Sequence, residues 1–257
     1  MPSTLCIGHR GARGHLPENT LPSFEHAINV GCDWVELDVY HVDGELLVIH
    51  DESVDRTTNG SGLVSKLSFD QLRALDAGGG HSIPTLQEVI DLVDRRCGIN
   101  VELKGPATAK PVGDLLSKYC LGNWVPRDFL ISSFNHTELK LADPTYPRGV
   151  LFAKRLPDMW QRAAQLGAWS VNFDKGEISR SLVEDAHARG YKVLAYTVNS
   201  NTDMLKMINY GVDGLFSDYP DRVISLREGV LREGALTEGG LREGVLREGV
   251  LWEDARE

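Results

Sequence analysis

The stretch WVELDV, Trp34–Val39, decides how the rest of the chain is interpreted. It has the pattern of a buried strand with two carboxylates on one face, because side chains at positions i and i+2 of a strand share a face. Two buried acids without partners are unfavourable, and their mutual repulsion raises a pKa. A cation held between Glu36 and Asp38 is the simplest interpretation. A second stretch, NVELKG at Asn100–Gly105, repeats the design with Glu102 and Lys104.

The segments around the first stretch predict a strand-helix-strand unit. A short apolar strand, Leu5–His9, is followed by an amphipathic helix, Leu21–Val30, and then by the Trp34–Val39 strand. Such a unit places its two strands parallel. The same alternation resumes from residue 99, with further strands predicted at Ile99–Leu103, Phe129–Ser133, Gly149–Phe152, Trp169–Phe173, Lys192–Thr197 and Gly214–Ser217.

Eight strands in alternation with helices predict a (β/α)8 TIM barrel over residues 1–226. The predicted helices of the second part are Lys110–Tyr119, His136–Ala142, Pro157–Leu166, Ser179–Arg189, Thr202–Asn209 and Pro220–Leu226. The alternative is an open doubly wound sheet, in which polar residues would gather at one switch point. We favour the barrel because polar residues end many different strands.

Two segments depart from the alternation. After an Asp43-Gly44 turn, Leu46–Ile49 is predicted to run back antiparallel, and an insertion follows over about residues 51–98. It is polar and glycine-rich from Glu52 to about Ser82, and capping-box patterns that begin at Ser68 and Thr85 predict two helices. The tail, residues 227–257, repeats the pentad REGVL, a period that matches neither a helix nor a strand. A glycine in each unit costs a helix about 1 kcal/mol. The tail is therefore predicted to be a poorly ordered, low-complexity extension.

Composition narrows the class of protein. The 257 residues carry a formal net charge of −10, which argues against a nucleic-acid partner. No apolar run reaches membrane-spanning length and no signal peptide is evident, so we expect no stable membrane insertion and a cytoplasmic location. The four cysteines are widely spaced and are interpreted as free thiols. No pattern specifies an oligomeric state.

The polar residues at the predicted strand ends describe one chemistry. Three acids on two neighbouring strands form an all-oxygen site that suits Mg²⁺ or Ca²⁺. Two histidines beside a metal can act as general acid and general base, and two fixed cations can bind an anionic oxygen. Together they indicate hydrolysis at a phosphoryl group by Glu36, Asp38, Glu102, His9, His50, Arg10 and Lys104. Ion pairs between these acids and bases, without a metal, are the alternative interpretation.

Seven short motifs occur in register and carry a family resemblance. They are GHRG at 8–11, PENT at 17–20, ELD at 36–38, HD at 50–51, ELK at 102–104, YTVN at 196–199 and SDYP at 217–220. Over about residues 5–225 the chain resembles the glycerophosphodiester phosphodiesterase family. The resemblance implies a TIM barrel that hydrolyses glycerophosphodiesters to an alcohol and sn-glycerol 3-phosphate, in lipid and glycerol metabolism.

The resemblance also implies roles for residues of this sequence. The histidines at 9 and 50 match the catalytic pair, the acids at 36, 38 and 102 match the metal ligands, and the cations at 10 and 104 match the phosphate contacts. Phe134 is our candidate to contact the glycerol moiety. Tyr196 stands where the family commonly has a tryptophan, which alters the pocket wall. The pentad tail has no counterpart in the family pattern.

Two other functions remain open from sequence alone. A lysophospholipase D-type enzyme shares this chemistry but needs an apolar groove for an acyl chain. A non-catalytic, phosphate-binding scaffold barrel would use the tail for interactions. The sequence also leaves open whether the nucleophile is water or the glycerol 2-hydroxyl, and which histidine is the acid.

Overall fold

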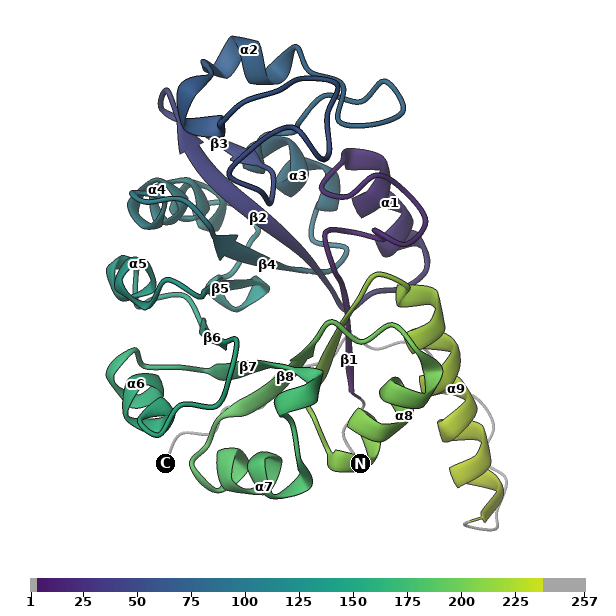
Figure 1. Ribbon diagram of the computed structural model, residues 1–257. Coiled ribbons are helices and arrows are strands. Elements are labelled where there is room, and N and C mark those ends of the chain that lie inside the picture. The colour runs from purple at the N-terminus through teal and green to yellow at the C-terminus, as the bar shows by residue number, and fades with distance from the viewer. Residues whose placement is uncertain (1–3, 238–257) are drawn as a thin grey trace.

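The computed structural model describes residues 4–237 as alternating strands and helices (Figure 1). The strands are β1 (Leu5–Gly8), β2 (Trp34–Val42), β3 (Glu45–Val48), β4 (Gly98–Leu103), β5 (Phe129–Ser133), β6 (Arg148–Phe152), β7 (Ser170–Asp174), β8 (Lys192–Tyr196) and β9 (Gly214–Ser217). The α-helices are α1 (Leu21–Asn29), α2 (Phe69–Arg73), α3 (Leu86–Val93), α4 (Ala109–Cys120), α5 (His136–Leu141), α6 (Met159–Gln165), α7 (Arg180–Ala188), α8 (Asn201–Tyr210) and α9 (Pro220–Thr237).

Eight parallel strands of the described chain close into a barrel. The order around the ring is β1, β9, β8, β7, β6, β5, β4 and β2, and β1 pairs with β2 to complete it. One helix follows each of these strands, either directly or, after β2, beyond a small lobe, and the helices surround the barrel in Figure 1. The predicted TIM barrel is confirmed. The open-sheet alternative is wrong because β1, at one end of this strand order, also pairs with β2 at the other end, so the eight strands form a closed ring.

The alternation of side chains along the strands produces two apolar layers. Outward-facing residues such as Val35 and Leu37 belong to the large cluster that packs against the helices. Inward-facing residues fill the barrel itself, among them Ile7, Trp34, Leu130, Leu194 and Phe216. The inner face of β2 therefore begins with an apolar side chain and continues with the two acids.

The predicted insertion is a small lobe built on an extended β2. This strand continues past its predicted end at Val39 because its last residues pair antiparallel with β3. The lobe has its own apolar cluster of Leu47, Ile49, Val54, Val64, Leu72, Ala77 and Ile83. Helix α3 packs on the barrel core instead, so the separate lobe ends near Ile83 and not at residue 98. The predicted capping boxes at Ser68 and Thr85 are both present.

Helix α9 differs from its predicted bounds. It was expected to end at Leu226, and it continues through the first pentads to Thr237. Its first part packs against α8 and β1, and an established helix can extend through a glycine because propagation adds one hydrogen bond for each residue. The remainder of the predicted tail, residues 238–257, lies outside the described residues. Within residues 4–237 no helix is long and apolar enough to cross a membrane.

Gly11, in the turn after β1, should not tolerate a side chain. Its φ is +82°, and a Cβ atom there would lie 2.5 Å from the Ser23 Oγ atom. Gly31 has a similar φ of +92° with open space around it. We expect Gly31→Ala to lower the free energy of unfolding by about 1–2 kcal/mol, the penalty for left-handed backbone. Gly11→Ala should lower it clearly further, as measured by urea denaturation, and equal losses would contradict the steric argument.

Candidate active site

Three carboxylates from neighbouring strands meet inside the barrel toward the C-terminal ends of the strands. Glu36 and Asp38 share the inner face of β2, and Glu102 is the register partner of Asp38 on β4. One oxygen atom of each carboxylate lies within 4.8 Å of those of the others, and all three residues are buried. The predicted proximity of the three acids is confirmed, while their role as metal ligands stays a prediction.

Two cations lie beside these acids but do not offset them fully. The Arg10 Nε atom is 3.3 Å from Asp38 Oδ2, and Lys104 Nζ donates to Glu102 Oε1 at 2.9 Å. Among the described residues, Glu36 accepts a hydrogen bond only from the backbone N–H of Arg10, at 2.9 Å. Burial and the neighbouring acids raise the pKa of Glu36 well above its usual range and that of Glu102 to about 7.

The three carboxylates fit a divalent cation as ligands. Asp38 Oδ1 is buried and has no hydrogen-bond donor within residues 4–237, although Lys104 Nζ lies 3.8 Å away. In this part of the chain, the ion-pair alternative leaves that oxygen unpaired and gives Glu36 a backbone donor as its only hydrogen bond. Hard carboxylate oxygens are the ligands that Mg²⁺ and Ca²⁺ prefer. Glu36, Asp38 and Glu102 are therefore the residues that would hold such an ion.

His9 follows β1 and is oriented by residues from the other end of the chain. Its Nδ1 atom donates to Asp218 Oδ1 at 2.6 Å, since a carboxylate can only accept. Asn199 donates to the second oxygen of Asp218 at 2.8 Å. Burial lowers the pKa of His9, although the bond to Asp218 opposes this shift. The neutral ring thus keeps its proton on Nδ1 and has Nε2 free for proton transfer.

His50 follows β3 and has a similar carboxylate support. Its Nδ1 atom donates to Asp51 Oδ1 at 2.6 Å, and its Nε2 atom lies 3.2 Å from Lys104 Nζ. Burial is the largest cause of the lowered pKa of His50. Asp51 in turn accepts from Arg56 Nε at 2.6 Å. Both histidines are therefore held in the same tautomer by an acid.

These groups surround a cavity of about 220 Å³. Phe134, the expected contact for glycerol, is 43% exposed beside the cavity, and its ring meets that of Tyr196 edge-on at 5.7 Å. The Tyr196 hydroxyl donates to the Phe152 carbonyl at 2.8 Å, so this residue offers its ring to the wall. The predicted site residues that line the cavity are His9, Arg10, Glu36, His50, Glu102, Phe134 and Tyr196.

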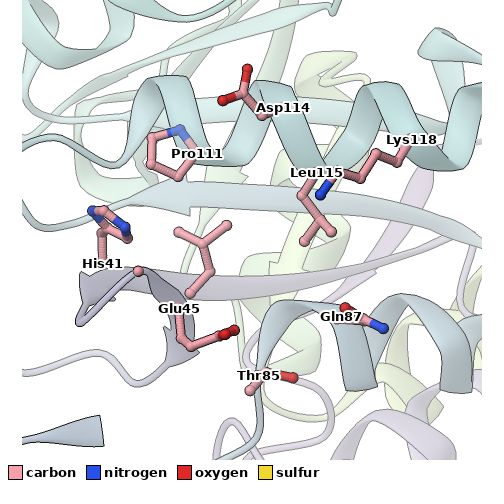
Figure 2. A pocket seen from close by; sticks show the side chains of 10 residues that line it. His41, Glu45, Thr85, Gln87, Pro111, Asp114, Leu115 and Lys118 are labelled. Atoms are coloured by element: carbon pink, nitrogen blue, oxygen red, sulfur yellow. The ribbon is translucent and has the colours of Figure 1, made fainter.

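A larger cavity, of about 390 Å³, lies elsewhere, and Figure 2 shows its lining. It lies between the β2–β3 turn, the start of α3 and one side of α4. Two of its polar groups have structural partners, because Asp114 pairs with Lys110 and Thr85 caps α3. No cluster of buried acids adjoins it in the described chain. We therefore assign the chemistry to the smaller cavity.

The sequence analysis assigned no role to the residues that support the histidines. Asp218 and Asn199 follow β9 and β8, and their place at strand ends was a usable signal for a supporting role. Asp51 directly follows His50. Glu18 and Arg56 come from irregular segments and join each other through two hydrogen bonds of 2.8 Å. No spacing pattern in the sequence brings this last pair together.

Comparisons with known proteins agree with this site. The model of the glycerophosphoryl diester phosphodiesterase family matches residues 9–222. A glycerophosphodiester phosphodiesterase of Caldanaerobacter subterraneus is 38% identical over 236 residues, covering 87% of this chain and 97% of the relative. Another, from Bacillus altitudinis, is 35% identical and covers 88% of this chain and 98% of the relative.

A solved structure is also similar. It is an Oleispira antarctica phosphodiesterase in complex with the product sn-glycerol-3-phosphate. The two proteins are 34% identical, with a TM-score of 0.80 and coverage of 88% of this chain and 97% of the other. The fold, the sequence and the family model all lead to one assignment, which confirms the resemblance seen in the motifs. This chain is an enzyme of the glycerophosphoryl diester phosphodiesterase family.

Proposed function

We propose that this enzyme releases sn-glycerol 3-phosphate and an alcohol from glycerophosphodiesters. The observation that carries the proposal is that both histidines, Glu36 and Glu102 line one cavity, with Asp38 in the same cluster of carboxylates. The product complex of the Oleispira antarctica relative supports the same product here. Because both histidines have their acid partners, catalysis is favoured over the scaffold alternative. The cytoplasm stays the expected compartment.

The chain's own residues can divide the proton transfers. One histidine takes the proton of the nucleophile at Nε2 while its Nδ1–H stays bonded to a carboxylate. The other, once protonated, gives its Nε2 proton to the departing alkoxide. Asp218 and Asp51 stabilise the imidazolium forms. Arg10 and Lys104 offset charge on the phosphoryl oxygens, and a bound Mg²⁺ or Ca²⁺ would polarise the same oxygens.

A divalent ion should stabilise the protein more at high pH than at low pH. Without a metal, the raised pKa values of Glu36 and Glu102 mean that the folded state binds more protons than the unfolded state between about pH 4.5 and 7. This contribution to stability is lost as the pH rises through 7, where an ion can replace the protons. At about 100 times Kd, the ion should add about 2.7 kcal/mol.

The measurement is the shift in Tm on adding Mg²⁺ or Ca²⁺ after EDTA treatment, at pH 6 and at pH 8. The shift should be larger at pH 8, and EDTA should remove phosphodiesterase activity that the ion restores. Asp38→Asn should abolish the shift while the protein stays folded. An unchanged shift in that variant would show that the ion binds elsewhere.

Replacing either catalytic histidine should remove turnover without unfolding the protein. His9→Ala and His50→Ala are each expected to lower kcat by about 10²–10⁴, the usual contribution of general acid–base catalysis. His187→Ala is the matched control, because His187 also pairs with an acid, Asp213 at 2.7 Å, but lies at the opposite end of the barrel. Release of glycerol 3-phosphate from glycerophosphocholine is measured. Near-normal turnover in either active-site variant would refute that residue's role.

The small cavity favours water-soluble substrates over lysolipids. A volume of about 220 Å³ accommodates a glycerophosphate group, and an acyl chain would have to lie outside it along the exposed Phe134. We expect kcat/KM for glycerophosphocholine to exceed that for lysophosphatidylcholine, both below the critical micelle concentration. The reverse order would identify a lysophospholipase D-type enzyme, and Phe134→Ala should then reduce lysolipid turnover selectively.

A further inference from the structure

Glu18, in the turn between β1 and α1, contacts three guanidinium groups. Arg10 donates to its Oε1 atom at 2.7 Å, and Arg13 Nε lies 2.9 Å from Oε2. Arg56 adds a two-pronged contact, with both hydrogen bonds at 2.8 Å. Burial alone would raise the pKa of Glu18, but hydrogen bonds from Arg56 and the charge of Arg10 lower it to about 2. This side chain is therefore a permanent anion in contact with a predicted phosphate ligand.

Arg56 connects this anion to the second catalytic histidine. It belongs to the lobe, and its Nε atom donates to Asp51 Oδ2 at 2.6 Å. The other oxygen of Asp51 accepts from His50 Nδ1 at 2.6 Å. The planar guanidinium group presents its donors in a rigid fork, so one side chain sets the positions of both carboxylates. The result is a continuous chain of charge-assisted hydrogen bonds from Glu18 to His50.

The two histidines are supported by different parts of the molecule. The partner of His9 is held by Asn199, and both belong to loops after barrel strands. The partner of His50 is held by Arg56, which comes from the lobe. The lobe therefore contributes the side chain that holds the partner of His50.

We propose that Arg56 is a positioning residue, which orients His50 through Asp51 and anchors the lobe to the barrel through Glu18. The inference rests on the proposed function, because it assigns His50 a catalytic role. It gives the lobe a purpose, because the lobe then completes the acid–base pair. A lysine could not replace Arg56, because one ammonium group cannot span both carboxylates in a fixed plane.

The competing explanation is a surface ion pair that only adds stability. Arg56 is 44% exposed in its side chain, and such pairs contribute little. Arg73 provides a matched control in the same lobe, since it makes a two-pronged contact to Glu88 at 2.6 and 2.9 Å, away from the histidines. Arg73→Ala loosens the lobe without touching the chain from Glu18 to His50.

The experiment compares kcat and KM for glycerophosphocholine in Arg56→Ala, Arg56→Lys and Arg73→Ala. We expect kcat to fall about 10–100-fold in both Arg56 variants, the usual effect of removing a supporting partner, with KM changed little. Arg73→Ala should keep kcat within about twofold. Guanidinium added below denaturing concentrations should restore part of the kcat of Arg56→Ala alone. Normal kcat in the Arg56 variants, or equal losses in Arg73→Ala, would overturn the proposal.

A double-mutant cycle tests whether Arg56 acts through Asp51. The loss of kcat in Asp51→Asn combined with Arg56→Ala should be no greater than in the worse single variant, whereas additive losses would contradict a shared path. The ¹⁵N shifts of His50 provide a readout that needs no activity. They should report Nδ1 protonation in the native protein and mixed tautomers in Arg56→Ala. A native enzyme that releases no glycerol 3-phosphate would refute the proposed function, whereas unchanged ¹⁵N shifts would refute the positioning role.

Discussion

Three carboxylates buried within 4.8 Å of one another are the constraint on which the rest of this site depends. Their repulsion in a region of low dielectric is unfavourable unless positive charge is supplied. The surrounding structure supplies it unevenly. Arg10 lies beside Asp38 and Lys104 beside Glu102, whereas Glu36 accepts a hydrogen bond from a backbone N–H. The shortfall is the physical basis for the proposed binding of a divalent ion and an anionic substrate at this end of the barrel.

The positively charged side chains near the site also need a partner of opposite charge. Arg10, Arg13 and Arg56 would repel one another if Glu18 did not lie among them. With Glu18 in place, the guanidinium groups converge from two separate segments and keep defined directions. Basic and acidic groups therefore alternate from Arg10 through Glu18 and Arg56 to Asp51, and each orients the next. A site of this kind is preorganised, so little reorientation is needed when a phosphodiester binds.

The site residues whose positions depend on the periodicity and order of the strands were predicted from the sequence. Glu36 and Asp38 followed from the two-residue repeat of a strand, and Glu102 from the repetition of the pattern on a later strand. His9 followed from its place at a strand end. The contact between Glu18 and Arg56 could not be predicted, because two irregular segments with no repeat bring it about. The end of α9 was misplaced because glycine penalties were weighed without the packing of the first turns of the helix.

The closure of the barrel has a consequence for the biosynthesis of this enzyme. Strand β1 completes its hydrogen bonding only when β9, at Gly214–Ser217, pairs with it. His9 and Asp218 are 209 residues apart in the chain, so the same event completes the site. A nascent chain on the ribosome therefore keeps two open strand edges, with unpaired backbone groups, until nearly the whole barrel has emerged. A chain truncated before residue 218 lacks the Asp218 partner of His9, so barrel closure and the support of this histidine depend on the last strand and the residue that follows it.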